Sequence, residues 1–219
     1  VLEASVFSIN VLLYGDYPAL ARRVLCSLLL TPRSFVTDIR IGLNAVSAQT
    51  RELAFGFCQQ SFVQSPCYIY EPLDGQNVGK YPLMRRMFYD ERRPLASKIM
   101  WFDDDSYLAN ADMSWWNEAA AESDKYVVMG ARHFIRPRGN QWEGVRAQPW
   151  YSGLPLTPTG MFSFITGGWW TAQTEFLHAW DYPFLDLHHN GGDSILGELA
   201  RQRSQPLGVF AKQLCHCPC

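Results

Sequence analysis

Apolar and polar positions alternate along roughly the first 130 residues in a way that predicts strands and helices in turn. Short apolar runs bounded by turn residues predict strands at 6–13, 39–43, 67–70, 98–102 and 126–129. Between them, apolar residues recur at helical spacing in 20–28, 53–58, 83–88 and 115–121. Asp16 and Ser47 precede the first two helical stretches and are expected to cap them. This order predicts an α/β fold with a Rossmann-like, mostly parallel central sheet and helices on both faces.

The pattern is less regular in the rest of the chain. Residues 136–158 are rich in Pro, Gly and Trp and have no clear period, which favours an active-site insertion over a linker between domains. A strand at 161–166, a helix at 194–203 and a strand at 207–210 are expected to follow. A length of 219 residues fits one large α/β domain better than two. We therefore expect a single domain over residues 1–219.

The composition is that of a globular protein. The chain is 47% hydrophobic and 18% charged with a net charge of −2, so neither disorder nor general attraction to nucleic acid or anionic membranes is expected. No apolar run approaches the ~20 residues that span a bilayer, and no signal peptide is evident. We expect a cytoplasmic protein with no membrane span in this chain. Because an apolar strand begins almost at residue 1, the chain resembles a trimmed or excised domain.

Cysteine usage favours a reducing compartment. Cys26 and Cys58 fall on apolar helical stripes and are expected to be buried thiols. The dense C-terminal group of Cys215, Cys217 and Cys219 lacks the paired spacing of a zinc finger. Metal binding and disulfide formation both stay open for that group.

The strongest chemical signal is an acidic run, Asp103, Asp104 and Asp105, directly after the apolar strand at 98–102. Adjacent carboxylates repel one another, so a divalent cation or a cationic partner would stabilise them. Asp103 and Asp105 are two residues apart and would point to the same side of an extended segment. Ligands of open α/β sheets bind outside the carboxyl ends of the strands. The run therefore predicts a cation site, with a solvated acidic turn as the alternative.

An apolar strand followed by Asp-x-Asp resembles the DxD motif of GT-A glycosyltransferases, which transfer a sugar from a nucleotide-sugar donor. The resemblance implies a GT-A fold in which residues 1–110 form the donor half, ending in this motif, and residues 111–219 form the acceptor half. The ends of the first two strands and an Asn-x-Gly turn before the third helix match donor-binding segments of the family. The implied donor-binding residues are Tyr14, Asp16, Asn44, Asn77, Lys80, Asp103 and Asp104. The family more often has Asp where this chain has Asn44, and Lys80 has an ordinary surface lysine as its alternative.

Further segments of the second half also resemble the family. Gly167 and Gly168 resemble the Gly-Gly segment under the donor sugar and acceptor, where backbone amides approach a ligand closely, with a tight turn as the alternative. Trp169 and Trp170 offer flat indole platforms for a sugar face, or else belong to the core. Asp193, at the expected start of a helix, resembles the catalytic base of inverting members, with an ordinary N-cap as the alternative.

The resemblance implies a divalent cation, Mn²⁺ or Mg²⁺, as cofactor, held by Asp103, Asp105 and His216. The cation would neutralise charge on the leaving nucleotide diphosphate while Asp193 takes the proton of the acceptor hydroxyl, with inversion. A UDP-sugar is the expected donor, and the acceptor is a glycan, a protein or another hydroxyl-bearing molecule. Candidates for the acceptor site are four arginines, which would suit a phosphorylated or nucleic-acid acceptor, and two histidines: Arg132, Arg136, Arg138, Arg146, His188 and His189.

Three other functions fit parts of the pattern. A sugar-phosphate nucleotidyltransferase shares the sheet and the acids but opens with a Gly-rich phosphate loop, which residues 13–17 do not form. A non-catalytic carbohydrate-binding domain would use the Trp residues for glycan and the acids for calcium. A metal-dependent hydrolase is disfavoured because no His-rich ligand set occurs early in the chain. Hydrolysis of a donor without acceptor would exclude the binding domain.

Overall fold

The computed structural model describes residues 6–60, 65–109, 111–135, 139–140, 165, 167–187, 191–205 and 207–216, and of 131–135, 139–140, 209 and 211–216 it describes the backbone only. Within this part of the chain, nine strands form one mixed sheet in the order β3-β2-β1-β4-β8-β6-β9-β5, with β7 beside β6. The strands are β1 (Phe7–Tyr14), β2 (Val36–Asn44), β3 (Cys67–Tyr70), β4 (Lys98–Asp103), β5 (Ser106–Tyr107), β6 (Val128–Ile135), β7 (Gly139–Asn140), β8 (Trp169–Gln173) and β9 (Leu207–His216).

Helices connect the first four strands as crossovers, so β1 to β4 run parallel. β9 is parallel to β6, whereas β8 lies antiparallel between β4 and β6. The predicted α/β fold with a mostly parallel sheet is confirmed. The helices are α1 (Pro18–Ser27), α2 (Ala48–Cys58), the short 3-10 helix η1 (Leu73–Gly75), α3 (Lys80–Phe88), α4 (Met113–Ser123), α6 (Thr174–Ala179) and α7 (Gly192–Gln202).

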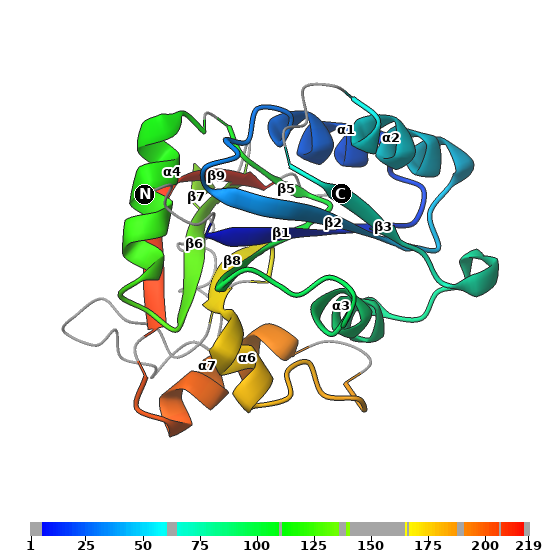
Figure 1. Ribbon diagram of the computed structural model, residues 1–219. Coiled ribbons are helices and arrows are strands. Elements are labelled where there is room, and N and C mark those ends of the chain that lie inside the picture. The colour runs from blue at the N-terminus through cyan, green and yellow to red at the C-terminus, as the bar shows by residue number, and fades with distance from the viewer. Residues whose placement is uncertain are drawn as a thin grey trace.

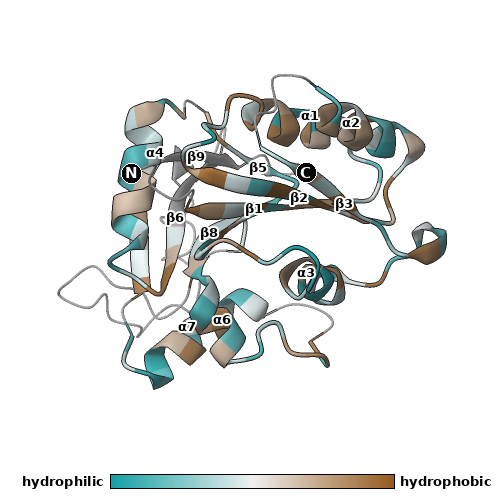
Figure 2. Cartoon of the chain, in the orientation of Figure 1, coloured by the Kyte–Doolittle hydropathy of each residue, from teal (hydrophilic) through white to brown (hydrophobic). Residues whose placement is uncertain are grey.

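The helices cover both faces of the sheet and enclose two apolar cores (Figure 1). One core, which includes Ile9, Ile41 and Trp116, lies on the face of α1, α2 and α4. The other core, which includes Leu83 and Trp101, lies on the face of α3, α6 and α7. Figure 2 shows the matching amphipathic pattern, with brown and teal residues on different sides of the helices. Side chains of one strand alternate between the two cores because successive residues point to opposite faces.

Local sequence explains where the first helices begin. Ser47 caps α2 as predicted, and its Oγ accepts a hydrogen bond from the Thr50 amide at 3.3 Å. The predicted cap by Asp16 is wrong, because Tyr17 is the N-cap residue of α1 and no side chain caps it. Pro18 follows at the first helical position, where its missing N–H leaves one donor fewer to satisfy.

The second half departs from the predicted boundaries. The strand β8 begins at Trp169, and of the predicted strand at 161–166 the structure describes Ile165 alone. β9 runs to His216 rather than ending near residue 210, and α6 was not predicted. Apart from the two residues of β7, the predicted insertion at 136–158 lies outside the described residues, as do His188, His189, Cys217 and Cys219.

The two cysteines predicted as buried thiols take other roles. Cys58 at the end of α2 is bonded to Cys67 at the start of β3, with a Cα–Cα distance of 5.3 Å, and Cys26 is an exposed free thiol. The helical stripe does not distinguish a buried thiol from one that faces a second cysteine on a neighbouring element. Because disulfides are rare in reducing compartments, this bond weighs against the cytoplasmic expectation. None of the helices described is both long enough and apolar enough to cross a bilayer.

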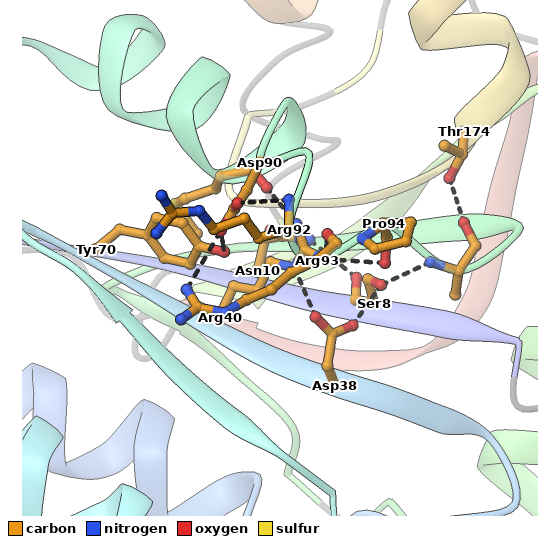
Figure 3. Close-up of polar contacts among 12 residues, drawn as sticks. Ser8, Asn10, Asp38, Arg40, Tyr70, Asp90, Arg92, Arg93, Pro94 and Thr174 are labelled. Carbon is orange, nitrogen blue, oxygen red and sulfur yellow. Dashed lines mark hydrogen bonds and ion pairs between the residues drawn. The ribbon is translucent and has the colours of Figure 1, made fainter.

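A polar network lies on the α3 face of β1 and β2 (Figure 3). Arg40 is fully buried, and its Nε lies 2.6 Å from Asp38 Oδ2. Asp38 also accepts a hydrogen bond from Ser8 Oγ. The Arg40 guanidinium donates to the backbone carbonyl oxygens of Met87, Arg93 and Pro94. These bonds satisfy a buried charge and hold the end of α3 and the loop after it against the sheet.

Candidate functional site

A pocket of about 300 Å³ opens at the carboxyl ends of β1, β2 and β4, beside the first residues of α3. The parallel register brings these strand ends together, since Tyr14 pairs with Asn44 and Leu12 with Asp103. The lining residues are Leu12, Tyr14, Asn44, Asn77, Gly79, Lys80, Asp103 and Asp104. The pocket therefore gathers six of the seven residues predicted to bind the donor.

The lining differs from the prediction at three positions. Asp16 is exposed in the turn after β1 and is not among the lining residues. Leu12 and Gly79 line the pocket but were not predicted, because an apolar side chain and a glycine carry no chemical signature. Leu12 could have been identified from its position, because it lies two residues before Tyr14 and therefore on the same face of β1.

Lys80 and Asp103 form an ion pair in this pocket. Lys80 is the first residue of α3, and its Nζ lies 2.7 Å from Asp103 Oδ1 and 2.8 Å from Oδ2. The indole Nε1 of Trp101 donates to Asp103 Oδ1 at 2.8 Å. Burial lowers the pKa of Lys80, but the adjacent Asp103 carboxylate outweighs it and holds that pKa above its ordinary value. Lys80 therefore stays cationic at neutral pH.

The carboxylates of the acidic run lie close enough to affect one another. Burial, followed by the negative charges of Asp105 and Asp103, raises the pKa of Asp104 to about 7, although a backbone hydrogen bond at Tyr14 opposes the shift. Ser106 Oγ lies 3.3 Å from Asp105 Oδ1. Carboxylate oxygens are the ligands that divalent cations such as Mg²⁺ and Mn²⁺ prefer.

The third predicted metal ligand lies at the same end of the sheet. His216 ends β9, and its backbone pairs with Ser106, the residue after Asp105. The structure describes His216 by its backbone alone. Among the side chains that it does describe, no three metal-ligating groups lie close enough to hold one ion. The residues present thus fit a cation through three adjacent carboxylates and through the β5–β9 pairing, which brings His216 opposite Ser106.

The second half of the chain contributes a glycine turn and an acid next to Lys80. Gly167 and Gly168 precede β8, and the Gly168 carbonyl oxygen accepts a hydrogen bond from the Asp103 amide at 2.8 Å. Asp193 lies in the first turn of α7 and does not cap that helix. A Cβ on Gly167 would lie 3.4 Å from Asp193 Oδ2 and 3.9 Å from Lys80 Nζ. The fold therefore brings these predicted residues from both halves to one place.

Tyr81 fixes the start of α7, although sequence reasoning missed it. Its hydroxyl oxygen accepts a hydrogen bond from the Gly192 amide at 2.8 Å, and burial raises the pKa of Tyr81. A Cβ on Gly192 would lie 2.3 Å from the ring, so only glycine allows this contact. In the sequence Tyr81 is one more apolar position of a helix. Its contact with α7 is what places Asp193 beside Lys80.

Solved glycosyltransferase structures have a similar architecture over nearly the whole chain. GalNAc-T7 with UDP, GalNAc and Mn²⁺ matches with a TM-score of 0.70 at 11% identity, over 98% of this chain and 44% of that one. TarS 1–349 of S. aureus in complex with UDP-GlcNAc matches with a TM-score of 0.69 at 13% identity, over 98% and 59%. The mannosyltransferase PcManGT from Pyrobaculum calidifontis in complex with GDP-Man and Mn²⁺ matches with a TM-score of 0.69 at 12% identity, over 97% and 57%. The chain has the GT-A fold.

The chain spans about half the length of these matched proteins. No protein-family model and no curated protein matches the sequence. The shared GT-A architecture gives the arrangement of strands and helices. The roles of individual residues therefore depend on the geometry described above.

Within the GT-A fold, Trp169 and Trp170 belong to the core. They are 0% and 2% exposed and point to opposite faces of β8. Trp169 packs on Phe102, and Trp170 stacks on Trp101 with ring centroids 5.9 Å apart. The prediction that they stack on a sugar is wrong, because they lie within a central strand and not in a loop after one. Of the predicted acceptor-site arginines, Arg132 is described by its backbone alone, and Arg136, Arg138 and Arg146 lie outside the described residues.

Proposed function

We propose that this chain is the catalytic part of a metal-dependent glycosyltransferase that moves a sugar from a nucleotide-sugar donor to an acceptor hydroxyl. The observation that carries the proposal is the convergence of Lys80, Asp103 and Asp193, from three distant segments, beside a pocket of about 300 Å³. Transfer from a nucleotide diphosphate needs positive charge at the leaving group and a base at the acceptor. We assign residues 1–110 to the donor part of the site and residues 111–219 to the acceptor part.

The acidic run is assigned to a divalent cation, Mn²⁺ or Mg²⁺. Asp105 would hold it together with Asp103 and His216. When bound, such a cation neutralises the charge that builds on the leaving nucleotide diphosphate. Two observations support the assignment: Mn²⁺ is present with GalNAc-T7 and PcManGT, and burial together with the charges of Asp105 and Asp103 raises the pKa of Asp104.

The pocket is assigned to the donor nucleotide. Lys80 supplies a fixed positive charge for a phosphate oxygen, and Tyr14, which is 46% exposed, offers a phenol ring to the nucleoside. We propose a UDP-sugar as the donor, since GalNAc-T7 and TarS are solved with UDP or a UDP-sugar. Donor phosphates would compete with Asp103 for Lys80.

Asp193 is assigned as the general base. Its carboxylate lies next to Gly167 and near Lys80, at the site where the two halves of the chain meet. It would take the proton from the acceptor hydroxyl as that oxygen attacks the anomeric carbon, and this single displacement inverts the configuration. The acceptor would be a glycan, a protein or another hydroxyl-bearing molecule.

The carbohydrate-binding alternative finds less support among the described residues. Of the indole rings on which it depended, Trp169 and Trp170 are buried, and Trp142 and Trp150 lie outside the described residues. A binding domain also has no use for a base positioned beside a phosphate-binding lysine. The transferase is therefore the function that the described residues fit best.

Donor hydrolysis tests this function. The protein is incubated with UDP-, GDP-, CMP- and dTDP-sugars and Mn²⁺, with and without EDTA, and release of each nucleotide is measured. We expect one nucleotide to be released in a metal-dependent way, and Asp105→Ala to lower the rate by roughly 100-fold or more. Asp193→Asn is expected to lower transfer to an acceptor by roughly 100-fold while leaving the affinity for the nucleotide nearly unchanged.

Glu52→Ala is the matched control, because Glu52 is an exposed acid of α2 outside the pocket lining. Its hydrolysis rate should equal that of the wild type. If no donor is bound or hydrolysed, the transferase proposal is wrong, and a screen of glycans for metal-dependent binding then tests the carbohydrate-binding alternative.

A further inference from the structure

The side-chain amide of Asn44 makes its hydrogen bonds within the protein. Asn44 ends β2 and is 2% exposed. Its Nδ2 donates to Asn77 Oδ1 at 2.9 Å, and its Oδ1 accepts from the Val78 amide at 2.9 Å. Asn77 Oδ1 also accepts from the Gly79 amide at 2.9 Å. Two hydrogen bonds thus join the end of β2 to the turn before α3, and a third lies within that turn.

The two backbone amides fix the orientation of both side chains. An N–H group can only donate, so the atoms that face the Val78 and Gly79 amides must be the oxygens of Asn44 and Asn77. The bond between the two side chains then runs from Asn44 Nδ2 to Asn77 Oδ1. An aspartate at position 44 has no donor for that bond and would place a negative charge against an acceptor oxygen.

The same contacts set the geometry of the pocket. Gly79 is the N-cap residue of α3 with a φ of 88°, and Lys80 follows it as the first helical residue. Lys80 in turn reaches Asp103. Asn77 is exposed and lines the pocket, and within the described part of the chain its Nδ2 has no hydrogen-bond partner. The pair therefore holds one amide donor, Asn77 Nδ2, at the wall of the pocket.

We propose that Asn44 is a positioning residue that does not contact the nucleobase, and that it holds Asn77 so that Nδ2 donates to an oxygen of the bound nucleotide. This inference rests on the proposed donor site and deepens it. It accounts for Asn at a position where GT-A enzymes more often have Asp. On this proposal Asn44 shapes the pocket for every nucleotide and does not select between nucleobases.

The binding test uses UDP and GDP with Mn²⁺ and measures each affinity by calorimetry. Asn44→Ala and Asn44→Asp are both expected to lower the affinities for UDP and GDP by a similar factor of about tenfold. Either change leaves a backbone or side-chain group of the turn without its hydrogen bond and moves the turn, which affects both ligands. Asn77→Ala should weaken both at least as much. A change of more than about fivefold in the ratio of UDP to GDP affinity in Asn44→Asp would overturn the proposal, since it would mean that position 44 discriminates between bases.

Gln76→Ala is the matched control, because Gln76 is an exposed amide next to Asn77 that does not line the pocket. Its affinities should equal those of the wild type. An equal loss in Gln76→Ala would also overturn the proposal, because any change in the turn would then explain the effect.

A ligand-free measurement separates this proposal from the proposed function. Urea unfolding of Asn44→Ala, Asn77→Ala and the double variant forms a double-mutant cycle. We expect a coupling of about tenfold in the unfolding equilibrium constant. Additive effects, within about twofold, would overturn the positioning role. If the wild type binds no nucleotide, the proposed function fails while this cycle still decides whether Asn44 positions Asn77.

Discussion

Gly192 meets the ring of Tyr81 at a distance that leaves no room for a side chain. A Cβ there would lie 2.3 Å from Cε1 and Cζ of that ring. Gly192→Ala is therefore expected to lower the free energy of unfolding by about 2–3 kcal/mol, because the buried ring must shift. Asp193 follows directly, so donor turnover should fall as well. Urea unfolding and the donor-hydrolysis assay measure the two effects.

Gly56 provides the matched control at the same scale. It also lies in a helix, α2, but a Cβ there meets nothing within 4 Å. Gly56→Ala is expected to raise the free energy of unfolding by about 0.5–1 kcal/mol, since alanine loses less conformational freedom on folding. If both substitutions changed stability in the same direction, the contact with Tyr81 would not be the cause.

Asp90 gives the stability of the protein a defined pH dependence. Although burial opposes it, hydrogen bonds from Tyr70 and the Arg92 amide, and then the charge of Arg93, hold the pKa of Asp90 below its ordinary value of 3.8. A lowered folded-state pKa means that the ionised form stabilises the fold above about pH 4, and that this contribution is lost as the pH falls through the folded-state value. Figure 3 shows these contacts.

Asp90→Asn is expected to lower the free energy of unfolding at pH 7 by about 0.5–1 kcal/mol. The difference from the wild type should shrink as the pH approaches 3. Unfolding curves of both proteins at several pH values between 3 and 7 measure it. A difference that stays constant over this range would show that the charge of Asp90 is not responsible.

Residues with a distinctive chemistry were predictable, and residues that act through packing were not. Charged residues that directly follow an apolar strand or a turn can be recognised in a sequence, as the acids at 103–105 and Lys80 were. Tyr81 and Leu12 look like any other apolar positions in a helix or strand. Trp169 illustrates the opposite error, because an indole has the same signature whether it binds a sugar or fills the core.

At the scale of secondary-structure elements, the buried network around Arg40 joins parts that are far apart in the sequence. Its guanidinium bonds to Asp38 within β2 and to carbonyl oxygens at the end of α3 and in the loop before β4. β1 joins through Ser8, whose Oγ also accepts a hydrogen bond from the Ala96 amide at 2.9 Å. The position of α3, and with it Lys80, depends on this network.

Arg40→Met is therefore expected to be costly. It leaves the Asp38 carboxylate buried without its cation, which typically lowers the free energy of unfolding by about 3–5 kcal/mol. Replacing both residues, as in Asp38→Leu with Arg40→Met, should recover a large part of the loss, because no charge is then left buried alone. Urea unfolding compares the variants. If the double variant were no more stable than Arg40→Met, the unpaired carboxylate would not be the main cost.

Elements with a clean period were predictable, and those shaped by tertiary contacts were not. β3 was predicted at its observed bounds and β4 within one residue, whereas α3 begins three residues before the predicted stretch at 83–88. The helix α6 has six residues, too few for a helical period to stand out. β8 was not predicted, because consecutive buried residues on both faces, such as Trp169 and Trp170, give a continuous apolar run instead of an alternation.

At the scale of the whole molecule, the alternation of strands and helices predicted the fold class but not the order of strands. The neighbouring pairs β1–β2 and β2–β3 follow from the tendency of consecutive strands to lie side by side. The insertion of β8 between β4 and β6 does not, because antiparallel pairing with a strand from the second half depends on contacts across the whole chain. The site shares this property, since Gly167 and Asp193 reach Lys80 through β8 and α7.

The place of β8 in the sheet also has a consequence during synthesis. β4 is complete once Asp103 has left the ribosome, but its partner on that side follows about 65 residues later. At about 5–20 residues per second this interval lasts roughly 3–13 s. For that time the nascent chain carries an apolar strand with an open edge, a template for pairing with other chains or for capture by chaperones. Translation thus delivers the carboxylates of the pocket well before the strand that covers the open edge of β4.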